Sequence, residues 1–185
     1  MRVEKILRPP GRPVVVHFTN GLQREFDEVV IATHSDEALG VLGDPTDLEK
    51  SVLAALPYRD NEVILHTDTR LLPKTQRAWS SWNYRLKPGN GRATVTYNMN
   101  ILQGLDAPET FCVTLNDTAS INPHRILGRF NYAHPQFTLE GMKAQQRWGE
   151  INGQNGTWFC GAYWQNGFHE DGLSSGLRVA ESLCM

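Results

Sequence analysis

The pattern of hydrophobic and polar residues changes several times along the chain, and its first clear element is a hairpin. Residues 14–19 are rich in β-branched and aromatic residues, residues 22–26 begin with Leu22 and end with Phe26, and Asn20-Gly21 lies between the two segments. Asn-Gly readily adopts the two positive φ angles of a type I′ turn. The pattern therefore predicts a β-hairpin with a two-residue turn.

Two apolar runs without polar alternation predict strands of a different kind. Residues 28–33 and residues 157–160 are such runs. A run of this kind is typical of a strand that is covered on both faces in a mostly parallel sheet. We expect these two strands and the hairpin to belong to one layer of the structure.

Helical spacing and capping residues predict three helices in the body of the chain. Residues 37–42 follow a polar capping turn, residues 46–56 end before Pro57, and residues 138–148 begin at Thr138. Proline after a periodic segment and threonine before one are common helix boundaries.

The region between these helices has the composition of short strands separated by Pro, Gly and Asn turns. The predicted strands are residues 62–67, 77–85, 92–100, 110–115 and 125–132. Successive strands joined by short turns pair antiparallel. The sequence therefore predicts an α+β fold, in which a mostly antiparallel domain with helices, residues 36–154, is inserted between two terminal pieces, residues 1–35 and 155–185.

Composition and charge exclude several classes of protein. Of the 185 residues, 40% are hydrophobic and 21% are charged, and the net charge is −2. We expect a globular protein without a basic surface for nucleic acid. The N-terminus lacks the apolar core of a signal peptide, and no apolar run approaches the length of a membrane span. Cys112, Cys160 and Cys184 lie outside any C-x-x-C pair, which favours a reducing, cytoplasmic setting.

The end of the chain carries the most informative chemistry. The predicted strand 157–160 is followed by a glycine-rich crossing and by a helix that residues 170–172 open. The first N–H groups of a helix lack intrahelical partners and carry the positive end of the dipole, so this arrangement forms a cradle for an anion or a cofactor. The structural alternative is that Gly167, Gly172 and Gly176 only allow a tight turn and close helix packing.

Other catalytic chemistries find little support in the sequence. His169, Glu170 and Asp171 are adjacent, so their side chains diverge on most backbones, and no H-x-x-x-H pair accompanies them. We therefore expect no metal site. Neither Ser-Ser pair lies in a G-x-S-x-G elbow, which argues against a serine hydrolase. Cys160, in a buried strand, is expected to be inert packing.

Two stretches of the chain carry a family resemblance. They are the hairpin leading into residues 26–33, and the ending 158–162 followed by 167–180. In this order they resemble the C-terminal part of the flavin-containing amine oxidoreductase family, which also includes carotenoid-desaturase-like proteins. The resemblance implies that the two terminal pieces form part of an FAD-binding domain and that the inserted region is a substrate domain.

The resemblance also implies which residues contact FAD. Gly161 and Ala162 would lie beside the ribityl or pyrophosphate portion, and the amides of Asp171, Gly172 and Leu173 would face the pyrimidine edge of the flavin. Ala162 stands where the family usually has an acidic residue, so the backbone provides the predicted contact.

Aromatic residues are the candidates for the substrate surface. Tyr163 and Trp164 follow the predicted cofactor loop and are expected to form a wall of the flavin or of the substrate site. Trp79 and Trp82 are expected to line an apolar substrate cavity in the inserted domain. The alternative for Trp79 and Trp82 is core packing on the sheet.

The predicted function is that of part of an FAD-dependent oxidoreductase, which oxidises an amine or an unsaturated, lipid-like substrate by hydride transfer to flavin. The chain contains no G-x-G-x-x-G motif, so we expect FAD in the complete protein and weak or no binding to this chain alone. The expected partner is an N-terminal dinucleotide-binding segment or a second copy. The alternative function is a non-enzymatic remnant that associates with itself or with another protein.

Overall fold

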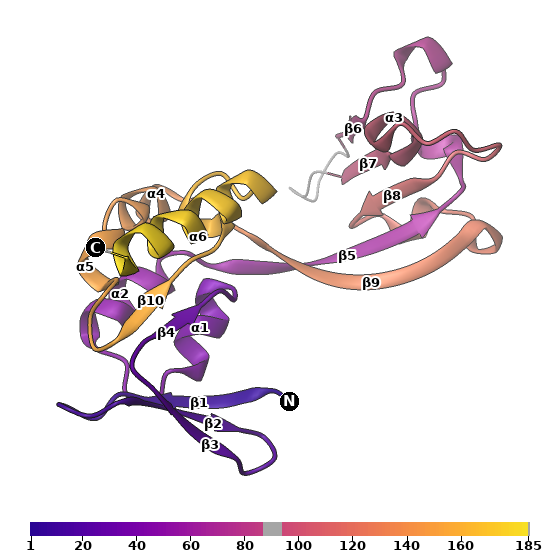
Figure 1. The fold of residues 1–185 in the computed structure, drawn as a ribbon. Helices are drawn as coiled ribbons and strands as arrows, with labels where there is room; N and C mark the ends of the chain where they lie inside the picture. The colour runs from indigo at the N-terminus through magenta and orange to yellow at the C-terminus, as the bar shows by residue number, and fades with distance from the viewer. Residues whose placement is uncertain (87–93, 185) are drawn as a thin grey trace. The chain divides into compact units, whose positions relative to one another are not determined.

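The computed structural model describes residues 1–86 and 94–184, which form two compact units. The terminal unit consists of Met1–Arg59 and His134–Met185, and the middle unit consists of Asp60–Ala133. Figure 1 shows helices and strands in both units, and most of the strand pairs are antiparallel. The predicted α+β class is therefore confirmed.

Three antiparallel strands open the terminal unit. They are β1 (Val3–Leu7), β2 (Val14–Phe18) and β3 (Gln23–Phe26), in the order β1-β2-β3. The predicted hairpin is confirmed as β2 and β3, but the predicted turn type is wrong. Only Gly21 of the Asn-Gly pair has a positive φ, of 81°, and Asn20 Oδ1 accepts a hydrogen bond from the N–H of Leu22. The asparagine side chain thus stabilises a turn that needs one left-handed residue.

The two apolar runs form a two-stranded parallel sheet. β4 (Val29–Ile31) lies beside β10 (Thr157–Phe159), with Val30 opposite Trp158. The prediction that both faces of β4 are covered is wrong. Ile31 is buried, whereas Val30, whose side chain points to the opposite face of the sheet, is 44% exposed, so only one face of β4 packs into the core.

Helices cover the remainder of the terminal unit. They are α1 (Ser35–Val41), α2 (Asp47–Ala54), α4 (Leu139–Gln145), α5 (Trp148–Ile151) and α6 (His169–Leu183). The predicted helix 138–148 is divided into α4 and α5 at Gln146 and Arg147. The buried core of this unit draws on both terminal pieces and on α1, α2, α4 and α5, with Val52, Ile151 and Phe159 among its least exposed members.

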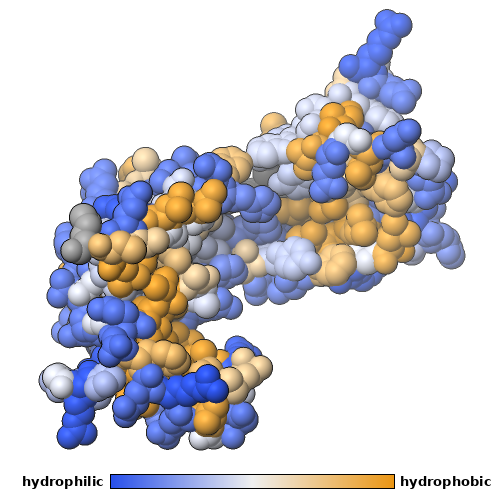
Figure 2. Space-filling view, viewed as in Figure 1, coloured by the Kyte–Doolittle hydropathy of each residue, from blue (hydrophilic) through white to orange (hydrophobic). Residues whose placement is uncertain are grey.

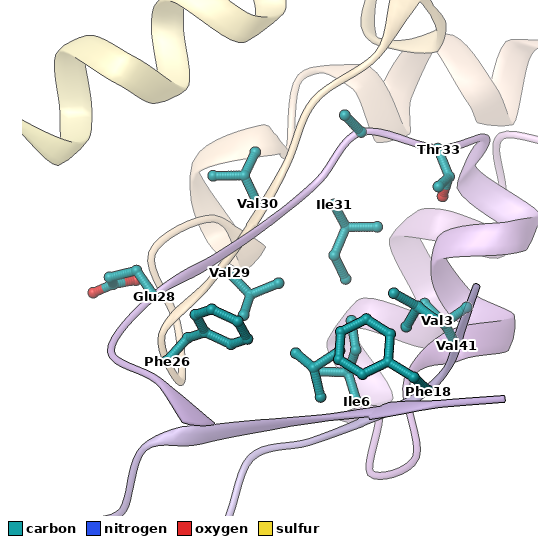
Figure 3. Close-up of a pocket in the computed structure, with 12 residues that line it drawn as sticks. Val3, Ile6, Phe18, Phe26, Glu28, Val29, Val30, Ile31, Thr33 and Val41 are labelled. Atoms are coloured by element: carbon teal, nitrogen blue, oxygen red, sulfur yellow. The ribbon is translucent and has the colours of Figure 1, made fainter. Parts of the chain in front are cut away.

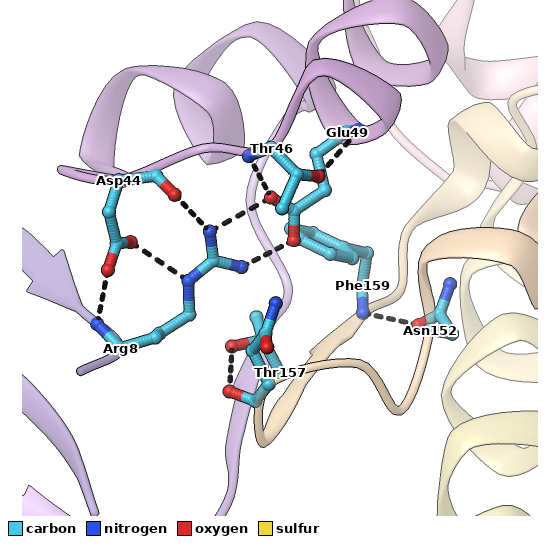
Figure 4. Close-up of polar contacts among 8 residues, drawn as sticks. Arg8, Asp44, Thr46, Glu49, Asn152, Thr157 and Phe159 are labelled. Carbon is cyan, nitrogen blue, oxygen red and sulfur yellow. Dashed lines mark hydrogen bonds and ion pairs between the residues drawn. The ribbon is translucent and has the colours of Figure 1, made fainter. Parts of the chain in front are cut away.

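A buried ion-pair network holds α2 against β1, as Figure 4 shows. The guanidinium of Arg8 donates to both carboxylate oxygens of Glu49 and also to Asp44. Burial alone would raise the pKa of Glu49, but the hydrogen bonds from Arg8 and from the N–H of Thr46 outweigh it, so the pKa is lowered. Glu49 therefore stays ionised in the core.

The middle unit contains a five-stranded sheet in the order β6-β7-β8-β5-β9. Its strands are β5 (Tyr58–His66), β6 (Trp82–Arg85), β7 (Thr94–Asn98), β8 (Cys112–Leu115) and β9 (Ile126–Pro135). The predicted strand 77–85 is correct only from Trp82 onward. The predicted strand 92–100 ends at Asn98, whose side chain caps the short helix α3 (Met99–Gln103); Arg92 and Ala93 lie outside the described residues.

Within residues 1–86 and 94–184, no helix has both the length and the apolar character that a membrane span requires.

Candidate cofactor cradle and substrate surface

The loop that follows β10 is fixed on two sides. The N–H of Cys160 donates to the carbonyl of Ile31 on β4 at 3.1 Å, and the N–H of Gly161 donates to Ser175 Oγ on α6 at 3.1 Å. A methyl group at Gly161 would lie 2.5 Å from Cε1 of Tyr163. A side chain at position 161 would therefore clash with the Tyr163 ring, so this position requires glycine. The bond to Ser175 keeps the loop close to α6.

The N-terminus of α6 meets the same loop. A Cβ atom at Gly172 would lie 3.8 Å from the backbone nitrogen of Ala162. Asp171 Oδ2 accepts hydrogen bonds from the N–H of Phe168 at 2.8 Å and of Asn166 at 3.2 Å. The structure thus brings Gly161, Ala162, Asp171 and Gly172 together, as the sequence predicts, although nothing in the fold tests their contact with a cofactor.

The start of α6 has the features of a helix N-terminus beside a glycine loop. α6 is 15 residues long, and the N–H groups that precede its first intrahelical bond carry the positive end of the helix dipole. The first such bond that reaches the N-cap is donated by Gly172, whose N–H bonds the carbonyl of Phe168 at 3.2 Å. Leu173 follows in the next turn and is 58% exposed. Gly172 adds no side chain to the space beside Ala162.

The other two glycines of the crossing have different roles. Gly167 has a φ of 85°, and a Cβ atom there would lie 3.2 Å from the ring of Phe137. It serves the tight turn. Gly176 has no atom within 4 Å of its Cβ position, so the idea that it permits close helix packing is wrong.

The side chains of Tyr163 and Trp164 lie in the hydrophobic core of the terminal unit, beside the loop that follows β10. They are 1% and 6% exposed, and their ring centroids lie 5.2 Å apart. Burial raises the pKa of Tyr163, and the nearby indole of Trp164 offsets part of that effect. Within the described part of the chain, neither Tyr163 Oη nor Trp164 Nε1 has a hydrogen-bond partner. Their predicted contacts with a flavin or a substrate stay predictions.

One face of the sheet in the middle unit is mostly polar and mostly buried. Its residues alternate along neighbouring strands and include Asn83, Thr94, Thr96, Asn98, Cys112, Thr114, Ile64 and His66. His66 Nε2 lies 2.7 Å from Thr114 Oγ1, which lies 2.8 Å from Thr96 Oγ1. Burial lowers the pKa of His66, although the neighbouring Asp68 opposes that shift. His66 is therefore neutral at pH 7.

The opposite face of this sheet is apolar and partly open. Its residues are Val63, Leu65, Val95, Val113, Leu115, Tyr97, Trp82 and Tyr84. Trp82 and Tyr84 are 45% and 67% exposed, and Trp82 packs edge-on against Tyr97 at 5.8 Å. Figure 2 shows hydrophobic residues at the surface of this unit. A sheet with one solvated face usually exposes its polar side, whereas the most exposed side chains on this face are the aromatic residues Trp82 and Tyr84.

Trp79 does not lie on this apolar face. It follows a short 3₁₀ turn, Gln76–Ala78, and its indole N–H donates to the carbonyl of Pro73 at 2.8 Å. The prediction that Trp79 and Trp82 share one strand is wrong, because β6 begins at Trp82. Among the small residues of α6, no feature of the sequence indicates that the hydroxyl of Ser175 accepts a hydrogen bond from the N–H of Gly161.

Fold and site together define an α+β protein that has a strand–loop–helix cradle in one unit and an apolar sheet face in the other. The sequence profile described as "Flavin containing amine oxidoreductase" matches residues 1–184. The chain therefore belongs to this family, and the resemblance noted in the sequence is confirmed.

Solved structures share the fold over only part of their length. The CLA-producing fatty acid isomerase from P. acnes is 14% identical with a TM-score of 0.61, and the match covers 97% of this chain and 46% of that one. Reduced UDP-galactopyranose mutase is 10% identical with a TM-score of 0.57, and the match covers 89% and 41%. The chain thus spans about half the length of these proteins. No curated protein sequence matches it.

Proposed function

We propose that this chain is the C-terminal part of an FAD-dependent oxidoreductase, which oxidises an amine or an unsaturated, lipid-like substrate. The observation that carries the proposal is the convergence of Gly161 and Ala162 with the N-terminus of α6. Membership of a flavin-containing family supports FAD as the ligand of this cradle.

When bound, FAD supplies the redox chemistry by accepting a hydride from the substrate. The residues of this chain bind and orient it. Asp171, Gly172 and Leu173, at the start of α6, would lie at the ring edge where negative charge gathers, and the positive end of the helix dipole would stabilise that charge. Gly161 and Ala162 leave room for a phosphate or ribityl chain to approach the backbone. Ser175 holds this loop in place.

The apolar sheet face of the middle unit is the proposed substrate surface. Trp82 would contact the substrate directly, with Tyr84 and Tyr97 beside it. Trp79, which is half-buried, would support this face by packing, whereas Trp164 is buried in the terminal unit and would pack beneath the cofactor loop. An apolar substrate is in keeping with the fold likeness to a fatty acid isomerase. An unsaturated, lipid-like substrate thus fits this face better than a small charged amine.

A partner segment completes the proposed site. FAD-binding domains of the dinucleotide type hold the pyrophosphate with a G-x-G-x-x-G turn, and the sequence contains none. We therefore propose that a dinucleotide-binding segment joins the terminal unit to form the full cofactor site.

The proposal is tested by filling the cradle with a side chain. Gly172→Val places methyl groups beside the nitrogen of Ala162, whereas Gly176→Val, one turn later on the same helix, meets no atom within 4 Å. In the chain joined to a dinucleotide-binding segment, we expect Gly172→Val to weaken FAD binding about tenfold or more and Gly176→Val to change it about twofold or less. Equal affinities in the two variants, measured by flavin fluorescence, would contradict the proposed cradle.

A non-enzymatic binding module is the second candidate function. Val30 is 44% exposed, and an apolar groove that includes Phe18, Phe26 and Ile31 lies beside β4 (Figure 3). These features favour this candidate, because an open strand edge is a ready site for pairing with another chain. The absence of flavin binding even with a dinucleotide-binding segment would favour it over the enzyme.

A further inference from the structure

Asparagine followed by glycine occurs five times in the chain, at Asn20, Asn90, Asn152, Asn155 and Asn166. In such a pair the backbone nitrogen of the glycine can attack the side-chain amide carbon of the asparagine, because glycine has no Cβ atom to hinder the approach. The reaction needs an asparagine side chain that is free to turn and a glycine N–H that is not held in a hydrogen bond. The structure describes four of these pairs, and Asn90 lies outside the described residues.

The pair at Asn152 is held on both reacting groups. Asn152 is 6% exposed, and its side-chain amide donates to the carbonyl of Trp148 at 2.9 Å and accepts from the N–H of Phe159 at 2.6 Å. Figure 4 shows the second of these bonds. The N–H of Gly153 donates to the carbonyl of Thr157 at 3.1 Å. Neither the attacking nitrogen nor the side chain is therefore free to react.

The first and the last of the described pairs are held at their glycines. The N–H of Gly21 donates to the carbonyl of Phe18 at 2.9 Å, and the N–H of Gly167 donates to the carbonyl of Ala162 at 3.2 Å. The attacking nitrogen must lose its proton, and a hydrogen-bonded N–H loses it less readily. These two pairs are therefore protected in part, although both of their asparagines are exposed.

Asn155 and Gly156 differ from the other three described pairs. Asn155 is exposed, and the two residues have φ angles of 51° and 64°, so they form the tip of a tight turn between Gln154 and Thr157. Within the part of the chain that the structure describes, the side chain of Asn155 and the N–H of Gly156 make no hydrogen bond. Both reacting groups are therefore free in this pair.

We propose that Asn155 is a site of spontaneous deamidation in the folded protein. The nitrogen of Gly156 attacks Cγ of Asn155, so a new C–N bond forms. The bond from Cγ to the amide nitrogen breaks, and ammonia leaves with the proton that Gly156 gives up. The cyclic imide then adds a water molecule, which opens either of its C–N bonds and yields aspartate or isoaspartate. These steps need no oxidant or reductant, and the proposal does not depend on flavin binding.

The reaction changes the start of β10. The carbonyl of Gly156 accepts from the N–H of Val29 on β4 at 2.9 Å. Isoaspartate adds a methylene group to the main chain just before this carbonyl, and both products add a negative charge. Glu28 Oε2 lies 3.8 Å from the Cβ position of Gly156, so the new charge arises near an existing one of the same sign. Deamidation therefore weakens the pairing of β10 with β4.

The test is incubation of the full chain at mildly alkaline pH, both folded and unfolded in guanidinium chloride. Chymotryptic peptides and their fragment ions in mass spectrometry assign the conversion to each asparagine. The ratio of folded to unfolded rate isolates the effect of the structure on each pair. We expect this ratio to be at least about fivefold higher for Asn155 than for Asn20, which is the factor expected from one hydrogen bond at the attacking nitrogen. A ratio for Asn155 that is equal to or below that of any other described pair would overturn the proposal.

The consequence for β10 is tested with Asn155→Gly. This variant lacks the reacting amide and keeps a residue that readily adopts a positive φ. After the same incubation, we expect the urea midpoint of the wild-type protein to fall further than that of Asn155→Gly, since reactions at the other asparagines affect both proteins alike. Equal falls in the two proteins would overturn the proposed weakening of the β10–β4 pair.

Discussion

A methyl group on Gly161 would lie 2.5 Å from one ring carbon of Tyr163 and 2.8 Å from another. Tyr163 is 1% exposed and packs against Tyr58 and Trp164, so its ring has no room to move. The sequence marks Gly161 as important only through the family resemblance. Position 161 requires glycine because the ring of Tyr163, two residues later, folds back against the loop. No rule of sequence spacing predicts that contact.

We expect Gly161→Ala to lower the free energy of unfolding by about 1–3 kcal/mol, because overpacking forces the Tyr163 ring or the loop to shift. The measurement is urea denaturation of both proteins. Gly40→Ala is the matched control: Gly40 lies in α1 with no atom within 4 Å of its Cβ position, and alanine there should stabilise the helix by about 0.5–1 kcal/mol. Equal effects of the two substitutions would contradict the packing described for the loop.

At the scale of elements, the sequence predicts where strands and helices lie better than it predicts which face they bury. The alternation of Thr94, Val95, Thr96 and Tyr97 in β7 identifies a strand. The usual rule would bury its valine and tyrosine and expose its threonines. Val95 is buried as expected, but the threonines are buried as well, because Thr96, Thr114 and His66 form hydrogen bonds with one another across three strands. Such a network depends on strand order, which local patterns do not define.

Acidification is expected to destabilise the middle unit through His66. Burial lowers the folded pKa of His66 below its ordinary value of 6.5. The unfolded state therefore takes up a proton first, and stability falls as the pH drops below about 6.5, by at most about 1.4 kcal/mol per pH unit.

Amide hydrogen exchange of β8 between pH 7 and pH 5, corrected for intrinsic rates, measures this loss. The variant His66→Gln keeps a polar side chain without titrating in this range, so its β8 should show a flatter pH dependence than the wild-type protein. The same slope in both proteins would show that another group is responsible.

At the scale of the whole molecule, the resemblance predicts that distant pieces of the chain meet, and β4 and β10 do pair in parallel. The extent of the terminal unit is less predictable. It includes α1, α2, α4 and α5, which the sequence placed in the inserted domain, because their apolar faces pack into the core of the terminal unit. The sequence also does not predict that β4 lies at the edge of a two-stranded sheet. An apolar run indicates a buried strand, but it does not indicate how many strands lie beside it.

The measurement that tests the account most directly is a titration of the chain with FAD, followed by flavin fluorescence and the visible spectrum. It is made without and with the N-terminal dinucleotide-binding segment of a family member, supplied as a separate polypeptide. The account predicts binding only when the segment is present, because this chain contributes the helix N-terminus and the glycine loop but no G-x-G-x-x-G turn. No binding in either case, or tight binding to the chain alone, would contradict it.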